Sequence, residues 1–227
     1  MCLLLVMGGA GAAAQQPTIE TELKPIVDQL ARTASSQQFS QIIGAARNSP
    51  QLARQLGSLV GQGKLTEIRI VTTNGPKPFR AWVDRTTMSF TAEFLKAQLD
   101  YRGPTFHAGD ILPNNTVYCL GHLAYHLAAG MPDPAKFPRL DDYVRQSLEI
   151  EAGGYVQGYN DVMDVALQAN NGKPLSERQA LPIMMNPWYR EALGKAKLTP
   201  TGAIELNPQN IALVVESLRN LKVTDLE

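Results

Sequence analysis

The sequence has few of the residues that carry distinctive chemistry. Its 227 residues include only two cysteines, Cys2 and Cys119, and three histidines. Two cysteines exclude a small fold held together by several disulfides. There is also no excess of charge, since lysine plus arginine and aspartate plus glutamate number 21 each. Nucleic acids and anionic membranes select for basic proteins, so we expect neither as the main partner.

A long hydrophobic run is also missing. The most apolar stretch, residues 1–14, is uncharged and too short to span a bilayer. It ends in small residues, and Ala12 and Ala14 fit a signal-peptidase site, which predicts cleavage near Gln15. We therefore expect a bacterial protein that is exported to the periplasm or secreted, without stable membrane insertion. Cleavage would remove Cys2 and so exclude an internal disulfide. The alternative is an apolar N-terminus without defined structure.

Apolar residues make up 44% of the chain, enough to build a hydrophobic core. Helical periodicity runs through residues 17–62, with a break at Asn48-Ser-Pro50. The period then changes to two, which predicts three short strands at residues 65–73, 79–83 and 88–90. Thr91 is placed to cap a helix that reaches Leu99.

A loop over residues 101–114 precedes a helix that begins at Asn115 or Thr116 and ends at Gly130. The longest helical pattern in the chain runs from Leu140 to Ala169. Shorter helices are predicted at residues 177–185, 188–197 and 208–221. The small strand group among many helices predicts a helix-rich α+β fold. We expect a single domain over residues 15–227, made of an N-terminal helical segment (15–63), a core that carries the motif (65–170) and C-terminal helices (171–227).

The residues with the clearest chemistry are His122 and His126. At about 100° per residue they lie about 40° apart on one helix face. Two imidazoles one turn apart can hold one zinc ion. The alternative is a pair of partly buried histidines that hydrogen-bond to their surroundings.

A third ligand is expected from the long helix that follows. Its buried stripe is predicted from Leu148, Ala152, Tyr155, Tyr159, Met163 and Ala166. Glu149 lies about 60° from Ala152, at the edge of this stripe, whereas Glu151 turns about 100° the other way. A carboxylate at the edge of a core needs a partner, so Glu149 is the predicted ligand and Glu151 the alternative.

These residues resemble a known family. Gly121-His122-Leu-Ala-Tyr-His126-Leu, followed by Glu149-Ile-Glu-Ala-Gly-Gly-Tyr155, is similar to zincin metallopeptidases of the gluzincin type, and especially to the phage-immunity type. The resemblance covers residues 65–170. It implies a zincin-like fold with the strand group packed on the metal-binding helices, and His122, His126 and Glu149 as zinc ligands.

Leu123 departs from the family pattern. The family has at this position the glutamate that takes a proton from the zinc-bound water. Leucine cannot accept a proton, so the resemblance supports a metal site more strongly than peptide hydrolysis.

Two further residues are candidates for the site. Cys119 shares the helix face of His122 and could be a fourth ligand, although a small buried apolar role is the simpler reading. His107 lies in the preceding loop, where it could replace the missing base or act as a ligand, or could be an ordinary surface histidine.

Three functions remain open at this point. The first is an exported zinc-binding protein, a degenerate metallopeptidase with a structural role or a role in binding a protein or peptide. The second is an active metal-dependent peptidase or other hydrolase, with His107 or Glu151 as an unconventional base. The third is a metal-free helical interaction domain.

Overall fold

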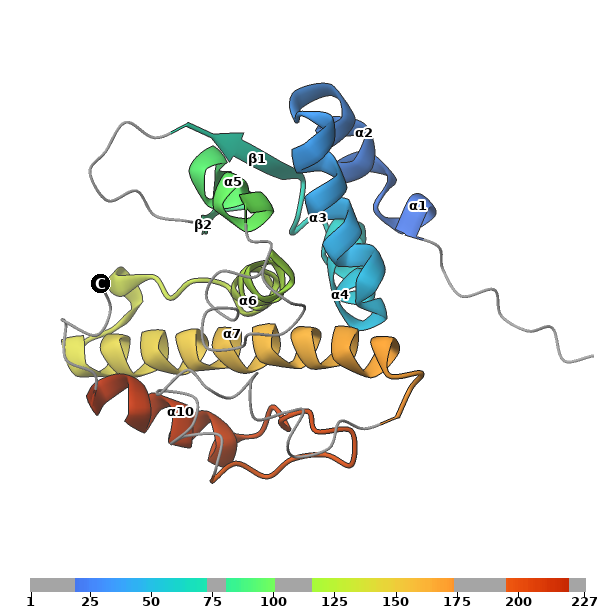
Figure 1. Cartoon of the computed structure of the whole chain (residues 1–227). Coiled ribbons are helices and arrows are strands. Elements are labelled where there is room, and N and C mark those ends of the chain that lie inside the picture. Colours follow the sequence, from blue (N-terminus) through green and yellow to red (C-terminus); the bar gives the residue numbers. More distant parts are fainter. Residues whose placement is uncertain (1–18, 73–80, 101–115, 174–194, 221–227) are drawn as a thin grey trace, which may run out of the picture.

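A computed structural model describes residues 19–72, 81–100, 116–173 and 195–220 of the chain (Figure 1). The helix-rich α+β class predicted from the sequence is confirmed in this part of the chain. The zincin-like assignment stays a prediction. The export signal, the loop with His107 and the helix expected at residues 177–185 lie outside the described residues, as does most of the one expected at 188–197. In the described part, no helix is both long and apolar enough to cross a membrane.

The chain begins with four helices: α1 (Ile19–Glu22), α2 (Lys24–Thr33), α3 (Ser36–Asn48) and α4 (Pro50–Gly61). Local signals set the boundaries. The side chain of Ser35 accepts a hydrogen bond from the backbone of Gln38, whose side chain bonds back to Ser35. Ser49 ends α3 and caps α4, in which Pro50 is the first residue. The predicted helical region and its break at residues 48–50 are therefore confirmed.

A small mixed sheet follows, made of β1 (Glu67–Val71), β2 (Ala81–Asp84) and β3 (Thr87–Thr91). The order is β1-β3-β2, with β3 parallel to β1 and antiparallel to β2. The central strand carries Met88 and Phe90, both fully buried. Thr91 accepts a hydrogen bond from Phe94 and so caps α5 (Ala92–Asp100), as predicted.

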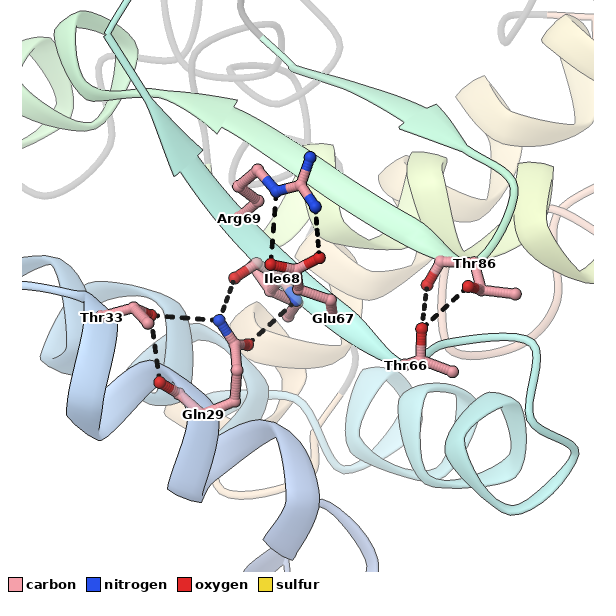
Figure 2. A network of polar contacts seen from close by, with 7 residues as sticks. All are labelled: Gln29, Thr33, Thr66, Glu67, Ile68, Arg69 and Thr86. Carbon is pink, nitrogen blue, oxygen red and sulfur yellow. Dashed lines mark hydrogen bonds and ion pairs between the residues drawn. The ribbon is translucent and has the colours of Figure 1, made fainter.

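Among the described residues, the outer edge of β1 is covered by a side chain and not by another strand. Gln29 of α2 donates a hydrogen bond to the carbonyl of Ile68 and accepts one from its N–H (Figure 2). On the inner side, toward β3, the Thr66 N–H just before β1 donates to the carbonyl of Thr86. The Gln29 amide thus occupies a donor and an acceptor that a further strand would otherwise use.

Two helices carry the candidate site. Helix α6 (Thr116–Ala129) ends at Gly130, which adopts a left-handed conformation with φ of 77°. A short 3-10 helix (Pro134–Lys136) leads to α7 (Leu140–Ala169), which has the bounds predicted from the sequence. Figure 1 shows α6 nearly end-on while α7 runs across the view, so the two helices cross at a steep angle.

Glycines allow the backbones of α6 and α7 to touch at this crossing. A Cβ atom on Gly121 would lie 3.2 Å from the Cα of Gly158, closer than ordinary van der Waals contact. A Cβ on Gly158 would in turn lie 2.7 Å from the carbonyl oxygen of Tyr118. The side chains that flank the crossing are therefore held close to the opposite helix.

On another side, α7 contacts the C-terminal part of the chain. Asn160 is buried and exchanges two hydrogen bonds with the backbone of Ile204, at 2.9 and 2.8 Å. The hydroxyl of Tyr159 donates to the carbonyl of Gly202. Helix α10 (Pro208–Asn220) lies along α7 on this side (Figure 1). Helix α7 thus has two buried faces, one toward α6 and one toward the C-terminal segment.

Candidate metal centre

His122 and His126 are the histidines that α6 presents to α7. They are one helical turn apart, and their rings stack with centroids 4.6 Å apart and planes inclined by 26°. Their side chains are only 14% and 9% exposed. The predicted placement of both imidazoles on one helix face is confirmed.

Glu151 of α7 lies against both rings. Its Oε1 is 3.4 Å from Nε2 of His122, and its Oε2 is 3.2 Å from Nε2 of His126. One ligand atom from each of the three residues falls within 4.8 Å of the others, and among the described residues this is the group of three with metal-ligand chemistry. We call His122, His126 and Glu151 the trio. The trio has the donor atoms that could hold a metal ion, since two imidazole nitrogens and a carboxylate oxygen are typical ligands of a divalent cation.

Gly154 of α7 forms the floor beneath the two rings. A Cβ atom at this position would lie 2.9 Å from Nε2 of His126 and 3.1 Å from Cε1 of His122. Any other residue would push the rings away from the backbone of α7. The absence of a side chain at Gly154 therefore keeps both imidazoles next to Glu151, which is one turn earlier on the same helix.

One nitrogen of the trio has no hydrogen bond. Nε2 of His126 is fully buried and makes no hydrogen bond of acceptable geometry, although Oε2 of Glu151 is close. Buried polar atoms in proteins are almost always paired, and an exception calls for an explanation. A metal ion held by this nitrogen and by Glu151 would provide the missing partner.

The charge of Glu151 suits a cation. Burial acts to raise the pKa of this carboxyl, but the adjoining imidazoles of His122 and His126 outweigh burial and hold the pKa well below its usual range. The carboxylate is therefore ionised at neutral pH. Tyr155, one turn further along α7, has its pKa raised, first by burial and then by the charge of Glu151, so its phenol keeps its proton.

The prediction that Glu149 faces the histidines, with Glu151 turned away, is wrong. Glu149 is exposed and lines a groove of about 720 Å³ between α7 and α10, together with Arg145 and Arg219. The reason is that α7 has two buried faces. The predicted stripe combined residues of both faces: Tyr155 lies against His122 of α6, whereas Tyr159 and Met163 contact Gly202 in the C-terminal segment. The face toward α6 also contains Gly154 and Gly158, and Glu151 lies on that face.

The other predicted residues fall outside the trio. Leu123 is 5% exposed and packs in the hydrophobic core. Cys119 is half-buried at the edge of the core and is not part of the trio, although it lies near enough to Tyr155 to affect its pKa. His107 lies outside the described residues. Gly154 and Tyr155 were not predicted as parts of the site; the signal in the sequence that could have found Gly154 is its place beside Gly153, since adjacent glycines in a helix favour close contact with a neighbour.

Comparisons with known proteins do not assign the chain to a family. No family model matches it, and neither does any curated protein or solved structure. The interpretation of the site therefore depends on its own geometry.

Proposed function

We propose that this chain is a metal-binding protein in which His122, His126 and Glu151 hold one divalent cation. The observation that carries the proposal is the convergence of the three ligand atoms within 4.8 Å, over a glycine floor that leaves room for both rings. The unpaired nitrogen of His126 supports it.

Zinc is the ion that this ligand set favours. Two histidines and a glutamate are a recurrent zinc set, and carboxylate and imidazole together suit zinc better than calcium or magnesium. Three protein ligands leave a fourth position for water or for another molecule. The Glu151 side chain is 37% exposed, so that position is within reach of solvent.

The role we propose is structural or binding, in an exported protein whose partner is a protein or peptide. A zincin-type peptidase needs a general base beside its first histidine, and Leu123 offers none. Because Leu123 is buried in the core, its position faces apolar side chains and not solvent. The resemblance of the histidine helix to zincin metallopeptidases, with leucine in place of the catalytic glutamate, agrees with this proposal.

The test compares two glutamates two residues apart. Mature protein purified without a metal-binding tag should contain about one zinc per chain by plasma mass spectrometry. Glu151→Gln should weaken zinc binding by orders of magnitude in a competitive chelator titration, because it removes a charged ligand. Glu149→Gln is the matched control and should bind like the wild type. Wild-type protein without metal, or the reverse ranking of the two variants, would refute the proposal.

A second candidate is a metal-dependent hydrolase, favoured by the number of protein ligands. Catalytic zinc sites have three protein ligands and an open position, whereas structural sites have four. If this candidate holds, the wild type should hydrolyse casein, and a chelator should stop the reaction. His107→Ala would then show whether His107 replaces the missing base. No chelator-sensitive hydrolysis by zinc-loaded protein favours the binding role.

A further inference from the structure

Tyr155 contacts two members of the trio at once. It lies four residues after Glu151 on α7, so the two side chains are neighbours on one helix face. The Glu151 carboxylate is near enough to the phenol to raise its pKa, after the larger effect of burial. Its ring lies edge-on to His122, with centroids 5.0 Å apart and planes at 84°.

Glu151 is the least constrained member of the trio. Its side chain is 37% exposed, whereas the two histidine side chains are 14% and 9% exposed and rest on the backbone of α7. A glutamate has three rotatable side-chain bonds, and ordering it costs conformational entropy. A metal ligand that is already ordered before the ion arrives binds the ion more tightly.

We propose that Tyr155 is the positioning residue of the metal site, whose hydroxyl holds the Glu151 carboxylate in the orientation that meets the ion. This inference rests on the proposed function of the trio. Tyr155 does not itself touch the metal. It donates its O–H to the carboxylate, which retains lone pairs for the ion, and it packs against the core on its other side. Ligand carboxylates in metal sites are commonly held by such a hydrogen bond.

The experiment separates the hydroxyl from the ring. Tyr155→Phe retains the ring beside His122 and removes the hydroxyl, and we expect zinc affinity to fall by about 10- to 100-fold. Tyr143→Phe, the same change twelve residues earlier on α7, is the control and should leave affinity unchanged. With Co²⁺ in place of zinc, Tyr155→Phe should also change the visible absorption spectrum, because the geometry of the carboxylate ligand changes. A role in packing alone would not alter that spectrum.

A double-mutant cycle tests whether Tyr155 acts through Glu151. In a Glu151→Gln background the charged acceptor is gone, so adding Tyr155→Phe should weaken zinc binding little further. Full additivity of the two losses would overturn the inference, as would wild-type zinc affinity and Co²⁺ spectrum in Tyr155→Phe. In both cases the wild type still binds metal, so the proposed function survives. A wild type that binds no metal overturns both proposals.

Discussion

The most direct test of the site geometry is Gly154→Ala, with Gly44→Ala as its matched control. Both glycines lie inside helices, α7 and α3. A Cβ on Gly154 would lie 2.9 and 3.0 Å from Nε2 and Cδ2 of His126 and 3.1 Å from Cε1 of His122. A Cβ on Gly44 would meet nothing within 4 Å. The two substitutions therefore bring the same gain in helix propensity, and they differ in what the new methyl group meets.

The magnitudes follow from these distances. Alanine inside a helix is favoured over glycine by about 0.5–1 kcal/mol, so Gly44→Ala should raise the free energy of unfolding by that amount. At Gly154 the same gain is opposed by overpacking, which typically costs about 1–3 kcal/mol. The net change in Gly154→Ala should thus lie between roughly zero and a loss of about 2.5 kcal/mol.

Metal binding should respond more strongly than stability. Ligand distances in a metal site have to be held within about 0.2 Å, and the methyl group would displace both imidazoles by more than that. We expect zinc affinity to fall by more than about tenfold, equal to about 1.4 kcal/mol, in Gly154→Ala and to stay unchanged in Gly44→Ala.

Urea unfolding of metal-free protein gives the stability of each variant, and chelator competition gives the zinc affinity. A Gly154→Ala protein that gains as much stability as Gly44→Ala and retains wild-type affinity would refute the reasoning. It would show that the histidine rings do not rest on the backbone of Gly154.

Three further predictions concern pH, the sheet edge and the stabilisation that zinc provides. Burial, helped by the nearby charge of Asp164, raises the pKa of Asp161 from 3.8 to about 7 against hydrogen bonds from two glutamines. The folded chain therefore holds this proton more tightly than the unfolded chain, so the free energy of unfolding falls as the pH rises from 3.8 to about 7. Asp161→Asn should reduce this fall in a series of urea unfolding curves measured against pH. Equal pH dependence in the wild type and the variant would contradict the assignment. Gln29→Ala leaves the outer N–H and carbonyl of Ile68 unpaired and should cost about 1–3 kcal/mol, with faster aggregation by light scattering; an unchanged urea midpoint would count against this role. Zinc at about a thousandfold excess over its Kd should raise the free energy of unfolding by about 4 kcal/mol, and the gain should vanish in His126→Ala; a gain of equal size in that variant would place the metal elsewhere.

Much of the secondary structure could be predicted because its causes are local. The bounds of α7 follow from a helical pattern that begins after a proline-rich linker and continues for 30 residues. The end of α6 follows from Gly130, since a left-handed residue ends the helix. The cap at Thr91 depends on a hydrogen bond over three residues. Each of these signals lies within a few positions of the boundary that it sets.

The histidine pair could be predicted for the same reason. An i, i+4 spacing places two side chains on one face of any α-helix, whatever the helix packs against. The third ligand is different, because its choice depends on which face of α7 meets α6. Periodicity placed Tyr155, which lies against α6, and Tyr159, which contacts the C-terminal segment, in one stripe, so it did not separate the two buried faces.

The sequence alone therefore determined the helices, the small strand group and the spacing of His122 and His126. Only the tertiary structure decided that Glu151, and not Glu149, lies against them. The contact between α6 and α7 depends on the absence of side chains at Gly121, Gly154 and Gly158. Glycine contributes nothing to a hydrophobic pattern, so a helix face that is buried through glycines carries no periodic signal, and its partner becomes visible only when the two backbones are placed together.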